Sequence, residues 1–176
     1  MATEQNLVDW HGSYSIGIPL IDEQHKELVN LTNKLYKSCM AGGEASKRNF
    51  MRTIRSAVDY IGYHFSTEEK IMARINYPGF AAHKKEHASF VKEVLHEVDE
   101  FNRGNKFTPT NFVRYLKDWV LTHIAVSDKA LGDYLLVIKK GGGLAHITLK
   151  VKELNPDGEN SGDGDQKNSA KRYAIA

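Results

Sequence analysis

Hydrophobic residues recur every three or four positions through most of the first 140 residues, the spacing that places side chains on one face of an α-helix. Helix-breaking residues interrupt this pattern at Gly42-Gly43, at Pro78-Gly79 and over 104–109. Helices are therefore predicted over residues 20–40, 45–75, 80–103 and 110–125, and the last pattern can be followed to 138. Long helices with short connections are typical of an all-α, antiparallel up-down-up-down four-helix bundle.

The ends of the chain differ from this pattern. Residues 1–18, which include Trp10 and Ile16, are expected to form an N-terminal arm that packs over the bundle. After the bundle, glycines 141–143 predict a hinge, alternation over 147–151 predicts a short strand, and the polar stretch 156–170 predicts a disordered tail. We therefore expect a bundle domain over 1–140 and a flexible C-terminal extension over 141–176.

Composition narrows the class of protein. With 41% hydrophobic and 26% charged residues, the 176-residue chain can bury a core. Its net charge of +2 does not indicate a nucleic-acid surface, and no apolar run is long enough for insertion in a membrane. The N-terminus does not resemble a secretory signal, and a single cysteine, Cys39, cannot form an internal disulfide. A cytoplasmic location is expected.

Each predicted hydrophobic stripe is interrupted by histidine. In the second helix the stripe also contains Glu68, and His64 precedes it by one turn on the same face. The histidines at core-facing positions are His25, His64, His83, His87 and His123. A buried carboxylate without a partner costs several kcal/mol, and a single buried histidine is usually a packing residue. Five histidines around a glutamate instead indicate a metal site.

The donor types restrict the metal. Imidazoles favour Zn, Cu, Fe or Ni over Ca or Mg. Five nitrogens exceed the four positions of tetrahedral zinc, so two ions with bridging ligands fit better. Glu68 is one candidate bridge, and Asp128, five residues after His123, is a second.

In order along the chain, these residues match the motif of the hemerythrin family: a lone His, His-x-x-x-Glu, His-x-x-x-His and His-x-x-x-x-Asp. The matching segments are IDEQHKEL around His25, HFSTE over 64–68, HKKEH over 83–87 and HIAVSD over 123–128. The chain resembles the single-domain bacterial hemerythrins over residues 8–138. It departs from them at Leu131, where family members commonly have an aromatic residue.

The resemblance implies a non-haem di-iron centre with an oxo or hydroxo bridge that binds O2 reversibly, for carriage, storage or delivery rather than catalysis. One iron would be held by His83, His87 and His123, the other by His25 and His64, and both would be bridged by Glu68 and Asp128. An imidazole-rich donor set also favours a carrier over the carboxylate-rich oxidases. A dry O2 pocket is predicted from Phe65, Trp119, Val120, Ile124 and Val126.

Two other functions remain open. The same di-iron site could serve oxygen or redox sensing or iron handling, with the C-terminal tail binding a protein partner. HKKEH also fits a zinc peptidase motif with Glu86 as general base, but that function leaves most of the other ligands unexplained. Otherwise Glu86 is expected to be a solvated charge beside lysines 84, 85 and 92.

Overall fold

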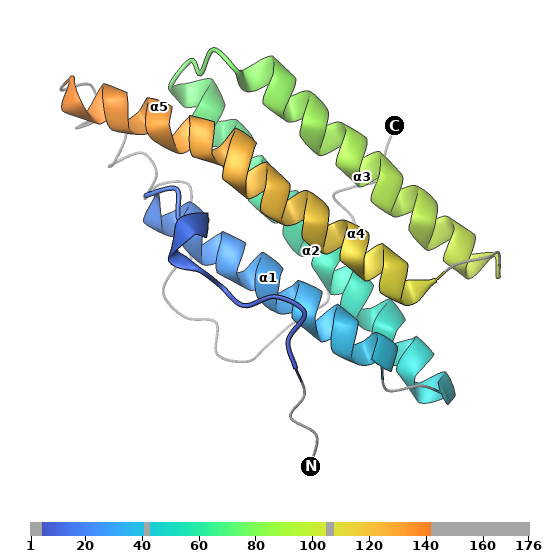
Figure 1. Ribbon diagram of the computed structural model, residues 1–176. Helices are drawn as coiled ribbons and strands as arrows, with labels where there is room; N and C mark the ends of the chain where they lie inside the picture. The colour runs from blue at the N-terminus through green and yellow to red at the C-terminus, as the bar shows by residue number, and fades with distance from the viewer. Residues whose placement is uncertain (1–4, 41–42, 105–107, 142–176) are drawn as a thin grey trace, which may run out of the picture.

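The computed structural model describes residues 5–40, 43–104 and 108–141. Its helices are α1 (Pro19–Met40), α2 (Gly43–Arg74), α3 (Phe80–Asn102), α4 (Pro109–His123) and α5 (Lys129–Lys140). A 3-10 turn, η1 (Gly12–Tyr14), precedes α1, and a five-residue π-helical segment, η2 (Ile124–Asp128), joins α4 to α5. In Figure 1 the segments α4, η2 and α5 continue as one rod, so that four rods form an antiparallel bundle.

The structure confirms the predicted fold class. Each predicted helix is present with small shifts at its ends, and the fourth continues through η2 to Lys140. Within the described ranges there is no strand. The predicted short strand and tail, and all but the first residue of the predicted hinge, lie outside the described residues.

Local signals set several helix ends. Pro19 and Pro109 occupy the first position of α1 and α4, where a missing N–H leaves no intrahelical bond unmade. After α2, Asn76 adopts a left-handed conformation with φ of 50°, and the N–H of Tyr77 donates to the carbonyl of Met72. The chain thereby reverses direction before α3.

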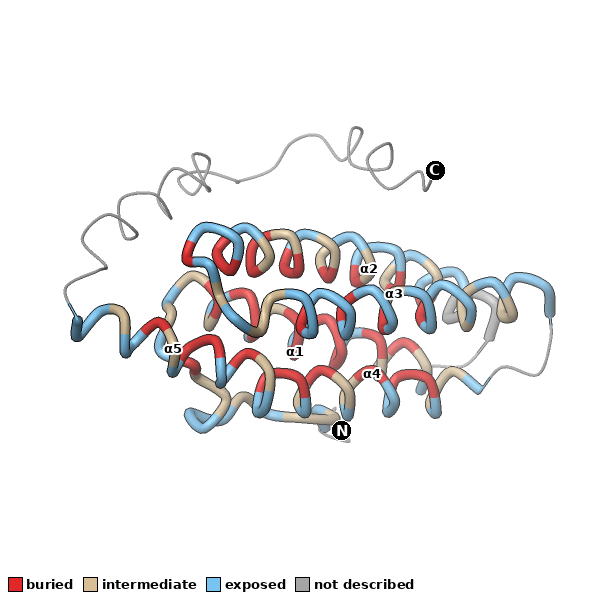
Figure 2. The backbone as a smooth tube through the Cα atoms, turned by 90° about the horizontal axis from the view of Figure 1, so that it is seen from above, coloured by how far each residue is buried: buried red, intermediate tan, exposed pale blue. Residues whose placement is uncertain are grey.

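The hydrophobic stripes face one another across the bundle. Figure 2 shows buried positions along the inner sides of the rods and exposed positions outside. α1 packs against α2 and α4, and α2 packs against α3. Among the described residues, no helix is both long and apolar enough to span a bilayer.

The N-terminal arm packs on the bundle as predicted. Ile16 is 1% exposed, and its N–H donates to Asp22 Oδ1 at 2.8 Å. The hydroxyl of Ser15 donates to the other oxygen of Asp22 at 2.6 Å. The arm lies so close to α5 that a Cβ on Gly132 would be 2.5 Å from the carbonyl oxygen of Ile16. Glycine at position 132 therefore permits this contact.

Candidate metal centre

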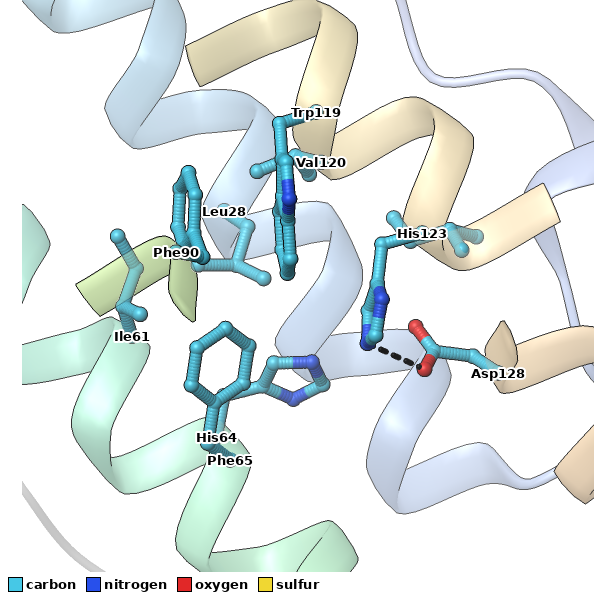
Figure 3. Close-up of a pocket in the computed structure, with 10 residues that line it drawn as sticks. Leu28, Ile61, His64, Phe65, Phe90, Trp119, Val120, His123 and Asp128 are labelled. Atoms are coloured by element: carbon cyan, nitrogen blue, oxygen red, sulfur yellow. Dashed lines mark ion pairs between the residues drawn. The ribbon is translucent and has the colours of Figure 1, made fainter. Parts of the chain in front are cut away.

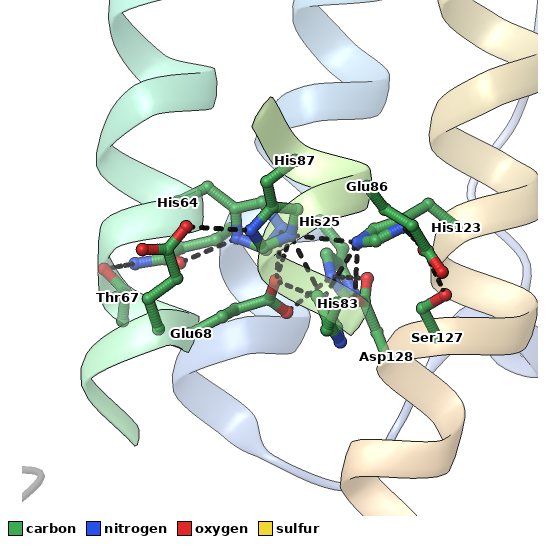
Figure 4. A network of polar contacts seen from close by, with 12 residues as sticks. His25, His64, Thr67, Glu68, His83, Glu86, His87, His123, Ser127 and Asp128 are labelled. Atoms are coloured by element: carbon green, nitrogen blue, oxygen red, sulfur yellow. Dashed lines mark hydrogen bonds and ion pairs between the residues drawn. The ribbon is translucent and has the colours of Figure 1, made fainter. Parts of the chain in front are cut away.

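Seven polar side chains meet in the interior of the bundle (Figure 4). Each is at most 5% exposed, and every rod contributes at least one of them. They are His25 from α1, His64 and Glu68 from α2, His83 and His87 from α3, His123 from α4 and Asp128 from η2. The structure thus brings together every residue that the sequence predicted for the metal site.

The seven side chains form two donor groups that share their carboxylates. One group contains His83, His87 and His123, and the other contains His25 and His64; Glu68 and Asp128 belong to both. Within each group, one donor atom from every residue lies within 4.8 Å of all the others. Two adjacent metal ions with two bridging carboxylates fit this arrangement.

Three imidazole nitrogens form a compact triangle. The Nε2 atoms of His83, His87 and His123 are separated by 3.1, 3.0 and 3.0 Å. Neighbouring corners of an octahedron are about 1.4 times the metal–ligand distance apart, so these separations correspond to about 2.1 Å, an ordinary metal–imidazole distance. Tetrahedral corners would be about 3.4 Å apart at the same bond length. The triangle therefore matches one face of an octahedral site.

The carboxylate oxygens lie between the two groups. Asp128 Oδ1 is 3.1 Å from Nε2 of His123 and 3.2 Å from Nε2 of His83, whereas Oδ2 is 3.0 Å from Nε2 of His25. Glu68 Oε2 is 3.2 Å from Nε2 of His87, and Oε1 is the oxygen nearer His25, at 3.9 Å. Asp128 thus presents one oxygen to each group, whereas Oε2 of Glu68 faces both groups, since it also lies 3.7 Å from Nε2 of His64.

Several of these buried atoms have no hydrogen bond. In the described part of the chain, both ring nitrogens of His25 and all four carboxylate oxygens of Glu68 and Asp128 are buried and unsatisfied. An unsatisfied buried polar group costs about 1–3 kcal/mol, and more when it is charged. Six such atoms at one point fit a bound cation, which would supply the missing interactions.

The electrostatics of the cluster agree with this fit. Burial lowers the pKa of His64 to about 3 and that of His87 to about 2, so both imidazoles are neutral and able to bind a metal. Burial acts likewise on His83, but the nearby carboxylates of Asp128 and Glu68, 3.2 and 3.4 Å from its Nε2, outweigh burial and raise its pKa to about 9. Burial, followed by the charge of Asp128, raises the pKa of Glu68 well above its usual value. Two buried carboxylates this close favour a cation between them.

The outer ring nitrogens of three histidines have partners that fix their orientation. The Nδ1–H of His64 donates to Oε1 of Gln24 at 3.0 Å, and that of His87 donates to Oε1 of Glu69 at 3.3 Å. The Nδ1–H of His123 donates to Oε2 of Glu86 at 3.1 Å. These bonds hold the proton on Nδ1 and leave the lone pair of Nε2 facing the cluster.

These outer contacts correct one expectation. Glu86 is 49% exposed, but it is more than a solvated charge, because it contacts His123 and accepts a 2.6 Å hydrogen bond from Ser127. Its carboxylate lies on the outer side of the His123 ring, away from Nε2. A general base for peptide hydrolysis must reach a metal-bound water. The position of Glu86 therefore argues against the zinc peptidase interpretation.

The two donor groups differ in these outer contacts. In the group with three histidines, two imidazoles are hydrogen-bonded to carboxylates, Glu69 and Glu86. In the other group, the partner of His64 is the neutral amide of Gln24, and Nδ1 of His25 has no hydrogen-bond partner among the residues that the structure describes. Since a carboxylate partner makes a ligating imidazole a stronger donor, the three-histidine group is the more electron-rich of the two.

A cavity of about 10 Å³ lies beside His64 (Figure 3). Apart from His64, His123 and Asp128, the side chains that line it are apolar. Four of the five predicted pocket residues are among them: Phe65, Trp119, Val120 and Ile124. The cavity has space for about one water-sized molecule.

Val126 was wrongly predicted as a pocket residue. Its side chain is 63% exposed and does not line the cavity. In a regular α-helix Val126 would share a face with His123, three residues earlier, but the π-helical turn rotates it outward.

The pocket is also lined by Leu28, Ile61 and Phe90, which were not among the predicted pocket residues. Each is three residues from a histidine of the cluster, as is Val120. Neighbours at that spacing lie one helical turn from the ligand on the same face, which is the signal that identifies them.

Comparison with known proteins agrees with the site. The model of the hemerythrin HHE cation binding domain matches residues 16–135. A bacteriohemerythrin of Stenotrophomonas maltophilia is 32% identical over 127 residues, which cover 72% of this chain and 80% of that protein. One of Methylococcus capsulatus is 28% identical over 73% of this chain and 97% of its own length. A crystal structure of wild-type hemerythrin matches with a TM-score of 0.66 at 30% identity, covering 72% of this chain and 96% of that one. This chain therefore belongs to the hemerythrin family and resembles its bacteriohemerythrins.

Proposed function

We propose that this protein binds O2 reversibly at a non-haem di-iron centre held by the seven clustered side chains. The observation that carries the proposal is the pair of donor groups sharing Glu68 and Asp128, with a small apolar cavity beside His64. When bound, the iron pair supplies the two electrons that O2 takes up and returns.

The two groups offer different numbers of donors. The group with three histidines has five donor residues and the group with His25 and His64 has four, when the shared carboxylates are counted in both. A six-coordinate ion has more unfilled positions in the four-donor group. The cavity is lined by His64 of that group and also by His123 of the other, so the number of donors, and not the position of the cavity, favours binding of a small ligand at the four-donor group.

The surrounding residues protect the site from water. Phe65 stacks on the ring of His87 with centroids 3.7 Å apart, and Trp119 stacks on His123 at 4.5 Å. Together with Val120, these side chains make the cavity a poor environment for water and small anions, which must lose hydration to enter. Exclusion of water and small anions favours release of the bound oxygen as O2 rather than as hydrogen peroxide.

The test measures metal and O2 together. Protein purified without added metal should contain two irons per chain. After anaerobic reduction, admission of air should produce a visible charge-transfer band that disappears under vacuum. His64→Ala should abolish the band, whereas His96→Ala, at an exposed position outside the cluster, should leave it unchanged. Tightly bound zinc without iron, or a band that vacuum does not remove, would contradict the proposal.

A further inference from the structure

A column of aromatic rings runs along α4 away from the candidate metal centre. Tyr115, Trp119 and His123 are four residues apart, so they lie along one side of the helix. The indole of Trp119 stacks on the imidazole of His123, with centroids 4.5 Å apart and an interplanar angle of 14° (Figure 3). The column therefore begins at a residue of the cluster.

Phe90 of α3 completes the column. Its ring stacks on Trp119 with a centroid distance of 3.7 Å and an angle of 9°, and it lies 6.1 Å from the ring of Tyr115. Phe90 is 1% exposed, whereas Tyr115 is 37% exposed. Continuous ring contacts thus connect the imidazole of His123 with the molecular surface.

The residue types in the column are suited to electron transfer. Tryptophan and tyrosine lose a single electron to strong oxidants far more readily than phenylalanine or aliphatic side chains do. Packing alone would accept leucine or phenylalanine at these positions. Here tryptophan lies next to the candidate ligand and tyrosine lies at the surface, the order in which an oxidising equivalent would leave the interior.

The surroundings of Tyr115 keep the resting phenol protonated and attract its proton once the phenol has been oxidised. A phenol gives up its proton when it loses an electron. Burial and then the negative charges of Glu93 and Glu97 raise the pKa of Tyr115, so it is a neutral phenol at pH 7. The same two carboxylates attract a proton released from an oxidised phenol.

We infer that Tyr115 and Trp119 relay electrons from donors at the surface to the metal centre when its ferric form reacts with hydrogen peroxide. This further activity rests on the proposed di-iron function. Because Tyr115 is exposed, the electron donor does not need to enter the cavity beside His64.

The reaction balances with hydrogen peroxide as oxidant and a one-electron donor of the ascorbate class as reductant. Breaking the O–O bond and forming two water molecules consumes two electrons and two protons. Each electron passes from the indole of Trp119 through His123, and the phenol of Tyr115 replaces it while releasing a proton to solvent. The donor returns one electron and one proton to Tyr115. Two donor molecules, each left as a radical, therefore balance one peroxide, and the irons return to the ferric state.

The test uses iron-loaded ferric protein mixed with hydrogen peroxide, with organic radicals followed by electron paramagnetic resonance. Ring-deuterated tyrosine separates tyrosyl from tryptophanyl signals. The parent should show a tyrosyl radical. Tyr115→Phe should remove this signal, leave a tryptophanyl radical and slow ascorbate-dependent peroxide consumption several-fold. Trp119→Phe should remove both radicals while iron content stays at the parent level.

Two matched controls lie outside the column. Tyr63→Phe changes a tyrosine on α2 that is 41% exposed, and Trp10→Phe changes the tryptophan of the N-terminal arm. Both should leave the radicals unchanged. A signal that persists in Tyr115→Phe but disappears in either control would overturn the relay, as would an iron-loaded parent without any radical. A chain that binds no iron would refute the proposed function and the relay together, and the iron analysis distinguishes that case.

Discussion

Asp128 Oδ1 lies 3.1 Å from Nε2 of His123, although the two residues are five positions apart on one continuous rod. In an α-helix, five residues rotate a side chain by about 140° relative to the first, which would place the two on different faces. The π-helical segment η2 has a wider turn and brings residues i and i+5 to the same side. The shared position of Asp128 therefore depends on this local change in helix type.

Asp128→Asn should weaken metal binding by about tenfold or more, because the amide keeps the shape of the carboxylate but removes its charge and one acceptor oxygen. Competition with a chelator, followed by metal analysis, measures the change. Asp133→Asn, at a side chain that is 63% exposed on α5, is the matched control and should bind metal like the parent. Equal metal retention in both variants would show that Asp128 is not a ligand.

Glu86→Gln should also weaken metal binding, by about tenfold, because the amide no longer places a negative charge at Nδ1 of His123. The same change should raise the reduction potential of the iron pair, since His123 becomes a weaker donor. Asp118→Asn, at a side chain that is 70% exposed, provides the control. A potential and a metal affinity equal to those of the control would contradict the role assigned to Glu86.

Removing the metal should lower the melting temperature by roughly 10 °C, because about 3 kcal/mol of stability is lost when the buried oxygens of Glu68 and Asp128 have no partner. Calorimetry before and after exhaustive chelation measures the shift. Restoring ferrous iron should recover the original melting temperature. If the chelated protein melts at the same temperature as the loaded one, the cluster is satisfied without metal.

Val120→Thr should increase the rate of autoxidation several-fold, because a hydroxyl in the cavity wall helps water and anions to enter. Val126→Thr makes the same chemical change at a side chain that is 63% exposed, and it should autoxidise at the parent rate. Decay of the oxygenated band at constant iron content measures both. Equal rates in the two variants would mean that Val120 does not line the oxygen site.

Gly132→Ala should destabilise the fold by about 1–3 kcal/mol, because its methyl group would collide with the backbone oxygen of Ile16. Gly12→Ala, where a Cβ meets no atom within 4 Å, should change stability little. Denaturant unfolding measures both changes. Equal stability of the two variants would show that the arm can move away from α5 at little cost.

The sequence was sufficient to predict the helical bundle and the clustered polar side chains, because polar residues interrupt regular hydrophobic stripes. Glu68 and His123 stand where a regular hydrophobic stripe requires an apolar residue, so a polar side chain there must face the core. Helical spacing then places His64 beside Glu68 and His83 beside His87. These inferences need only local periodicity, which regular helices keep on folding. Asp128 follows a π-helical turn and was instead identified by its five-residue spacing from His123 and by the family motif.

The remaining features depend on contacts between helices or on irregular backbone. Nothing in the sequence near Glu86 indicates that it contacts His123, 37 residues away. The outward position of Val126 follows from the π-helical turn, which periodicity does not predict. The aromatic column likewise requires Phe90 from α3 to stack on α4.

The seven clustered residues are spread along the chain from His25 to Asp128, so the set is incomplete in any fragment that stops before residue 128. A ribosome must therefore finish nearly the whole bundle before the full site exists, and shorter nascent chains offer only partial sets such as His64 with Glu68. An ion bound to the complete set would close a loop over most of the chain and act as a cross-link. Release of the ion and separation of the helices would therefore be coupled. The complete site therefore exists only after residue 128 has been synthesised and has packed into the bundle.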